Sequence, residues 1–160
     1  MDTNNTKLPK RKATRLPDYN YAEQNYYFIT ICTSEKKCIF GSAGTLNDYG
    51  KIANEAMQSI SQIYDGIFVD KYVVMPNHIH AIIAIEKENG VSLTHVVGQY
   101  KMIVTKRIHQ IGKNVKVWQR SFHDHIIRNQ HDYQQIWLYI QENPQNWKKD
   151  CFYIAFEEER

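Results

Sequence analysis

Residues 73–85 are Val73-Val74-Met75-Pro76-Asn77-His78-Ile79-His80-Ala81-Ile82-Ile83-Ala84-Ile85, an apolar run that carries two histidines two positions apart. Side chains alternate between the two faces of a β-strand, so we expect His78 and His80 on one face and Ile79 on the opposite, core-facing side. Pro76 and Asn77 are typical of a turn, which predicts one strand over 67–75 and another over 78–85. The sequence therefore predicts a hairpin with two imidazoles on one face, where they can share a metal ion.

Further strands and helices are predicted on both sides of this hairpin. Aromatic and β-branched residues indicate a strand over 26–33, and apolar residues at helical spacing indicate helices over 52–63 and 93–108. A more polar strand is expected over 121–128. The order β, α, β, β, α, β is typical of the split βαβ arrangement, in which two helices cover one face of an antiparallel sheet. We therefore expect an α+β fold whose other sheet face is available.

A last helix is expected to begin near Asp132, which can cap it, and to end before Pro144. Tyr139 and Asn143 are four residues apart on this helix, so they share one of its faces. The helix can lie over the open face of the sheet. This arrangement would bring a phenol and an amide next to the histidine pair.

Two neutral imidazoles and one neutral amide oxygen would leave a divalent ion with its full charge. Such an ion can polarise a phosphate oxygen, and Mg²⁺ or Mn²⁺ suit that role, with the Tyr139 phenol as the nucleophile. Alternatives stay open, because the histidines could line a half-buried strand and Tyr139 could be a packed aromatic residue. Tyr133 lies on the same helix but is turned about 240° from Tyr139, so one of the two tyrosines can meet the ion.

The composition fits one domain with a basic end. The chain has 160 residues, of which 42% are hydrophobic, enough for a core. Residues 1–24 lack apolar periodicity and contain a group of basic residues, Lys7, Lys10, Arg11, Lys12 and Arg15. We therefore expect a basic N-terminal arm over 1–24 and a single domain over 25–160, with a merely solvated terminus as the alternative.

The cysteines and the hydropathy indicate a soluble, cytoplasmic protein. Three cysteines without paired spacing argue against a disulfide framework. No apolar stretch approaches the roughly 18 to 20 residues needed to span a bilayer, and the N-terminus is polar and basic rather than a signal sequence. We expect no membrane partner.

Several short motifs occur in a fixed order along the chain. They are the histidine pair after Met75-Pro76-Asn77, then Trp118-Gln119-Arg120, His125-Ile126-Ile127-Arg128-Asn129, Tyr139-Ile140 and Asn143-Pro144. Together they resemble the single-tyrosine HUH transposases, and more narrowly the REP-associated tyrosine transposase group and its close relatives. The similarity runs from about Arg11 to Trp147, which is most of the chain.

This resemblance implies a ferredoxin-like sheet with His78 and His80 as central metal ligands, Asn143 as the third ligand and Tyr139 as the nucleophile. Some members of the wider superfamily use a glutamine as the third ligand, and Asn143 is one methylene shorter. The family cleaves single-stranded DNA through a 5′-phosphotyrosine that leaves a free 3′-OH, and its members usually recognise short hairpins. The resemblance also implies a homodimer, although monomers occur among the closest relatives and the spacing does not decide between them.

A DNA substrate predicts basic and aromatic contacts and a protein associated with the nucleoid. The candidate DNA-contacting residues are Lys10, Arg11, Lys12, Arg15, Trp118, Arg120, His125 and Arg128. Trp118 could instead only pack, and His125 could belong to a solvated strand edge. Two further functions remain open, a replication or conjugation nickase and a non-catalytic, domesticated DNA hairpin-binding protein.

Overall fold

A four-stranded antiparallel sheet in the order β4-β5-β1-β6 forms the centre of the computed structural model, which describes residues 15–112 and 114–154. Its elements, in chain order, are β1 (Asn25–Cys32), η1 (Ser34–Lys36), β2 (Gly41–Ser42), β3 (Thr45–Leu46), α1 (Asp48–Ile63), β4 (Ile67–Val74), β5 (His78–Ile85), α2 (Leu93–Ile111), β6 (His123–Ile127), α3 (Gln130–Glu142) and η2 (Trp147–Lys149). The expected α+β fold with a βαββαβ core and an added helix is confirmed.

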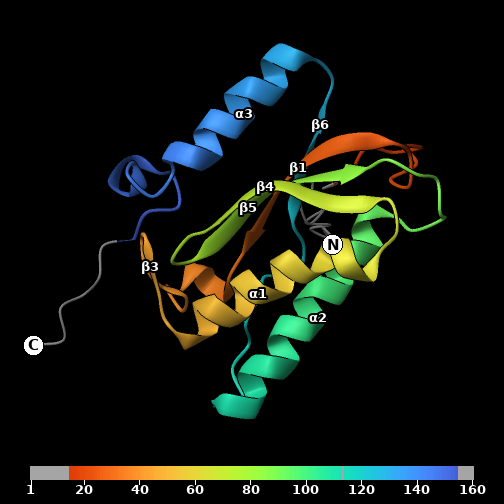
Figure 1. The fold of residues 1–160 in the computed structure, drawn as a ribbon. Helices are drawn as coiled ribbons and strands as arrows, with labels where there is room; N and C mark the ends of the chain where they lie inside the picture. Colours follow the sequence, from red (N-terminus) through yellow and green to blue (C-terminus); the bar gives the residue numbers. More distant parts are fainter. Residues whose placement is uncertain (1–14, 113, 155–160) are drawn as a thin grey trace, which may run out of the picture.

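The helices are divided between the two faces of the sheet (Figure 1). One face carries α1 and α2, which bury Tyr27, Ile29 and Ile31 of β1 in the main core. The other face is partly covered by α3, whose Ile140 packs with Ile82 of β5 in a second, smaller cluster. Because residues alternate along β5, the residues at 78, 80 and 82 all face the α3 side.

The predicted hairpin of β4 and β5 is present. Val74 is paired with Ile79, and the backbone N–H of Met75 donates to the carbonyl of His78 at 2.8 Å. All eight residues of β5 are buried, since this strand lies between β4 and β1 and both of its faces are covered. The histidine pair therefore sits in the interior of the sheet and not at an edge.

The start of α3 differs from the prediction. Asn129, and not Asp132, is the N-cap, because its side-chain oxygen accepts the backbone N–H of Asp132 at 2.8 Å. Asparagine and aspartate are both favoured caps, and the apolar spacing does not set the first turn. The carboxylate of Asp132 instead lies 2.7 Å from Nε2 of His125. The helix ends at Glu142, before Pro144, as expected.

The segment before β1 packs against the domain. Tyr21 is 8% exposed and its carbonyl accepts the backbone N–H of Leu93 at the start of α2. Arg15 donates to Asp124 of β6 at 2.8 Å. Lys10, Arg11 and Lys12 of the expected arm lie outside the described residues.

All three cysteines, Cys32, Cys38 and Cys151, carry free thiols, and Cys32 is buried in the interior. Within the described part of the chain, no helix is both long enough and apolar enough to cross a membrane.

Candidate active site

His78 and His80 lie side by side on the α3 face of β5, with ring centroids 4.5 Å apart. His78 is fully buried and His80 is 2% exposed. Each ring is fixed through its Nδ1 atom, which lies 2.8 Å from Asn77 Oδ1 in His78 and 2.8 Å from Thr30 Oγ1 in His80. Metal-binding histidines are usually oriented in this way, by a hydrogen bond at the nitrogen that does not bind the ion.

The proton of His78 can be assigned from its neighbours. The side-chain nitrogen of Asn77 donates to the carbonyls of Lys36 and Phe152 at 3.1 and 2.8 Å, so its oxygen faces His78. An amide oxygen only accepts, and Nδ1 of His78 must therefore carry the proton. The Nε2 atom of His78 is left with a lone pair that points into the site.

The C-terminal helix brings Tyr139 and Asn143 to the same place, as the sequence predicts. The Tyr139 hydroxyl lies 3.3 Å from His80 Nε2, and 42% of the Tyr139 surface is exposed. Asn143 is the C-cap of α3 and is 3% exposed. Tyr133 faces elsewhere, because its hydroxyl donates to Asp70 of β4. Tyr139 is therefore the tyrosine of α3 that meets the histidine pair.

Two buried atoms at this site lack a hydrogen-bond partner among the described residues, His78 Nε2 and Asn143 Oδ1. Both offer electron pairs, and leaving such a group unsatisfied in the interior costs about 1–3 kcal/mol. A divalent cation would satisfy both, and imidazole nitrogens and amide oxygens are common ligands for one. The residues present thus fit a metal ion.

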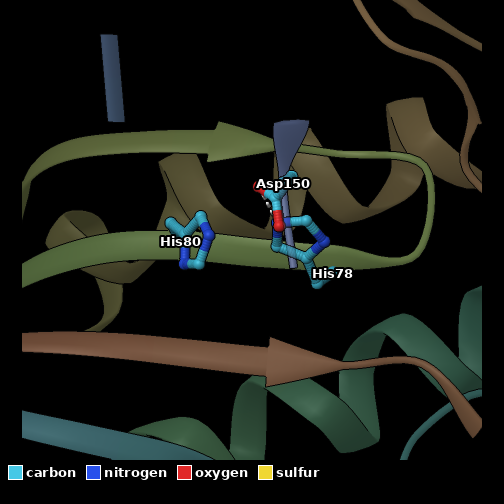
Figure 2. A group of neighbouring side chains, drawn as sticks. All are labelled: His78, His80 and Asp150. Atoms are coloured by element: carbon cyan, nitrogen blue, oxygen red, sulfur yellow. Dashed lines mark ion pairs between the residues drawn. The ribbon is translucent and has the colours of Figure 1, made fainter. Parts of the chain in front are cut away.

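Asp150 joins the site from beyond the C-terminal helix, and sequence reasoning did not anticipate it. Its Oδ2 atom lies 3.8 Å from His78 Nε2 and accepts a hydrogen bond from the Asn143 side chain at 3.0 Å. One ligand atom from each of His78, His80 and Asp150 lies within 4.8 Å of the others (Figure 2). The sequence feature that could have indicated Asp150 is a carboxylate seven residues after Asn143, in the segment that follows Pro144.

Burial sets the protonation of these groups. Desolvation lowers the pKa of His78 to about 4 and holds the pKa of His80 well below its ordinary value. Both rings are therefore neutral at pH 7 and can act as ligands. Desolvation, followed by the charge of Asp150, raises the pKa of Tyr139, so its phenol keeps its proton. A cation placed among these groups would act in the opposite direction on the phenol.

The candidate DNA-contacting residues in the described part of the chain differ in exposure. Arg120, His125 and Arg128 are exposed. Arg15 binds Asp124, and its guanidinium group lies 3.5 Å from the centre of the Phe122 ring.

Arg128 borders two hollows at the C-terminal end of β6. One, of about 460 Å³, also contains Tyr26 and Tyr133, and the other, of about 270 Å³, also contains Arg15 and His125.

Trp118, a candidate DNA contact that could instead only pack, lies packed in the core. It is 7% exposed and stands against Phe40 and Tyr100 in the main core. Its indole N–H donates to the backbone carbonyl of Lys101 at 3.1 Å. This position is on the side of the sheet that carries α1 and α2, away from the histidine pair.

The chain is similar to known proteins over most of its length. A family model described as "Transposase IS200 like" matches residues 21–143. A protein of Haemophilus influenzae described only as uncharacterized is 32% identical in an alignment of 174 positions, which spans 94% of this chain and 97% of that protein.

Two solved structures have the same fold. A REP-associated tyrosine transposase bound to a REP hairpin matches with a TM-score of 0.64 and 20% identity, over 82% of this chain and 73% of the other. A candidate transposase from Deinococcus radiodurans R1 matches with a TM-score of 0.53 and 16% identity, over 80% of this chain and 95% of the other.

Proposed function

Because the chain belongs to the IS200-like transposase family, we propose that it cleaves and rejoins single-stranded DNA beside hairpins, with Tyr139 as the nucleophile. His78, His80 and Asn143 would hold a Mg²⁺ or Mn²⁺ ion. The observation that carries the proposal is the 3.3 Å distance between the Tyr139 hydroxyl and His80 Nε2, which places a half-exposed phenol at the edge of a buried ligand set.

In the proposed cleavage step, the Tyr139 oxygen attacks the phosphorus of a phosphodiester and gives its proton to solvent. The bond from phosphorus to the 3′ oxygen breaks, and this oxygen takes a proton from solvent to become a free 3′-OH. The new bond is a 5′-phosphotyrosine. Rejoining is the reverse displacement, in which a 3′-OH attacks the phosphotyrosine and releases the phenol. One phosphoester replaces another at each step, so no nucleotide cofactor is needed.

The ligand set suits charge stabilisation at phosphate. A bound divalent ion would supply Lewis-acid polarisation of a phosphate oxygen and stabilise the extra negative charge of the transition state. The rings of His80 and His78 have defined orientations, because the Nδ1 atom of each ring is hydrogen-bonded. The partner is Thr30 for His80 and Asn77 for His78. Tyr139 and Asn143 come from one face of α3, so the helix fixes the nucleophile relative to the third ligand.

A DNA hairpin is the proposed partner. The solved tyrosine transposase that shares this fold is described as bound to a REP hairpin. On this chain, Arg128 stands exposed between a hollow with two tyrosines and a hollow with Arg15 and His125. Unpaired bases stack on aromatic rings, and arginines neutralise phosphates. We propose Arg120, Arg128, His125 and the basic residues Lys10, Arg11 and Lys12 as DNA contacts, and leave Trp118 out because it is buried.

The test uses purified protein, Mn²⁺ and single-stranded oligonucleotides that cover the DNA flanking its own gene. We expect both binding and cleavage of an oligonucleotide that contains a hairpin. In the Tyr139→Phe variant cleavage should vanish while hairpin binding stays nearly intact, because the phenol oxygen is removed and the ring is kept. If the parent protein binds the hairpin but does not cleave it, with Mg²⁺ as well as with Mn²⁺, the result would favour a non-catalytic hairpin-binding protein.

A further inference from the structure

We propose that Asp150 is an additional, anionic ligand of the divalent ion, and that the segment from Trp147 to Phe152 delivers it to the histidine pair. This inference rests on the proposed metal site and extends it beyond His78, His80 and Asn143. Asp150 follows η2 and comes from outside the sheet and the three helices. Figure 2 shows its carboxylate beside His78, with His80 on the same strand.

The environment of the Asp150 carboxylate is incomplete without a cation. Its side chain is 1% exposed, and a buried carboxylate is costly unless it is paired. Its hydrogen bonds come from neutral groups, the Asn143 side chain to Oδ2 at 3.0 Å and the Phe152 backbone N–H to Oδ1 at 2.8 Å. Among the described residues, its one charged or chargeable partner within ion-pair distance is His78.

The facing atoms of His78 and Asp150 are both electron donors. The side-chain oxygen of Asn77 accepts a hydrogen bond from the protonated Nδ1 of His78, so Nε2 keeps its lone pair, which is directed into the site. Oδ2 of Asp150 stands 3.8 Å from that nitrogen, and the unpartnered Oδ1 of Asn143 belongs to the residue that holds Asp150. His78 Nε2 and Asp150 Oδ2 therefore face each other with no donor hydrogen between them. A cation bound by both atoms would turn this repulsive arrangement into ligation.

The segment that carries Asp150 is held by Asn77, the residue that also orients His78. The Asn77 side chain binds His78 through its oxygen and the Phe152 carbonyl through its nitrogen, at 2.8 Å each. The His78 ring lies near the rings of Phe152 and Trp147, with centroid distances of 4.5 and 6.0 Å. The segment that carries the carboxylate is thus fixed against the ligand itself, so little ordering is required when an ion binds.

The ligand chemistry predicts selectivity. Two imidazoles alone suit ions such as Ni²⁺ and Zn²⁺, whereas added oxygen ligands, and above all a carboxylate, favour Mg²⁺ and Mn²⁺. Removing the charge of Asp150 should therefore weaken Mn²⁺ binding more than Ni²⁺ binding. A purely structural aspartate would give no such difference between the two ions.

The experiment is a calorimetric titration of the full chain with Mn²⁺ and, separately, with Ni²⁺, without DNA, for the parent, Asp150→Asn and Asp132→Asn. Asp132 is a matched control, since it also lies against a histidine, His125, but on the surface. We expect Asp150→Asn to lower Mn²⁺ affinity about tenfold to a hundredfold and to lower Ni²⁺ affinity less. Asp132→Asn should bind both ions like the parent. Equal Mn²⁺ affinity in parent and Asp150→Asn would overturn the inference.

A second measurement avoids the risk that Asp150→Asn misfolds. In the parent protein labelled with ¹³C, Mg²⁺ should move the side-chain carboxyl resonance of Asp150 and leave that of Asp132 in place. An Asp150 resonance that does not move at saturating Mg²⁺ would overturn the inference while leaving the proposed metal site intact. A parent protein that binds neither ion would overturn the inference and the metal part of the proposed function together.

Discussion

The hydroxyl oxygen of Tyr139 lies 3.3 Å from Nε2 of His80, although the two residues are 59 positions apart in the chain. The contact joins α3 to β5, on the face of the sheet that α1 and α2 do not cover. The proposed nucleophile lies on a helix, and the proposed histidine ligands lie on a buried strand. If these roles hold, the parts of the site are already close together before DNA binds, which favours a displacement at phosphate.

Loss of a histidine ligand should abolish cleavage through loss of the metal. His80→Ala removes one of the proposed nitrogen ligands, so we expect Mn²⁺ binding and cleavage to disappear together. Chelator should have the same effect on the parent. His95→Ala, on the exposed surface of α2, is the control and should behave like the parent. Cleavage that persists in chelator would contradict the metal role.

Thr30 should act as a positioning residue for His80. Its hydroxyl lies 2.8 Å from His80 Nδ1, and Thr30→Val keeps the shape while removing that hydrogen bond. We expect Mn²⁺ affinity to fall about tenfold to a hundredfold in calorimetry. Thr30→Ser keeps a hydroxyl and should restore most of the affinity. Thr30→Val with the Mn²⁺ affinity of the parent would show that His80 needs no partner at Nδ1.

Acid should destabilise the metal-free protein through the buried histidines. The pKa of His78 is lowered from 6.5 to about 4 by desolvation, so between these values the unfolded chain binds a proton that the folded chain excludes. The free energy of unfolding should therefore fall as the pH drops from 6.5 toward 4. Urea unfolding in chelator at several pH values measures this. His78→Ala should show a smaller pH dependence of the free energy of unfolding. An unchanged pH dependence in this variant would contradict the attribution of the effect to His78.

The basic residues before the described part of the chain should contribute to DNA affinity. Replacing Lys10, Arg11 and Lys12 by Gln should weaken hairpin binding at low salt. Each lost phosphate contact should reduce the slope of log affinity against log salt by about 0.7 to 0.9. Fluorescence anisotropy over a range of salt concentrations measures both effects. Identical slopes for parent and variant would exclude these residues from the interface.

Much of the fold and half of the site follow from local periodicity. Alternation along β5 correctly placed His78 and His80 on one face, and helical spacing correctly placed Tyr139 beside Asn143 and turned Tyr133 away. Such relations need only the geometry of one strand or one helix. The pairing of strands followed from the order of elements along the chain.

What could not be predicted depends on contacts between distant segments. Asp150 reaches the site because Phe152 is bound by Asn77, 75 residues earlier, and no periodic pattern marks that segment. Arg15 was predicted to belong to a basic arm and to contact DNA, and in the structure its guanidinium group also pairs with Asp124 on β6. The start of α3 is a different case, because asparagine and aspartate both favour the cap position and the local sequence does not choose between Asn129 and Asp132. The contacts of Asp150 and Arg15 are not encoded within a single element.

The central claim is that Tyr139 becomes covalently attached to the 5′ side of the cleaved strand. Its most direct test is mass spectrometry of the protein–DNA adduct after reaction with Mn²⁺ and a cleavable hairpin oligonucleotide, followed by digestion of protein and DNA. The account predicts a nucleotide 5′-phosphate on the peptide that contains Tyr139, and an adduct that survives in Tyr133→Phe but is absent in Tyr139→Phe. An adduct mapped to another residue, or cleavage by Tyr139→Phe at the rate of the parent, would contradict it.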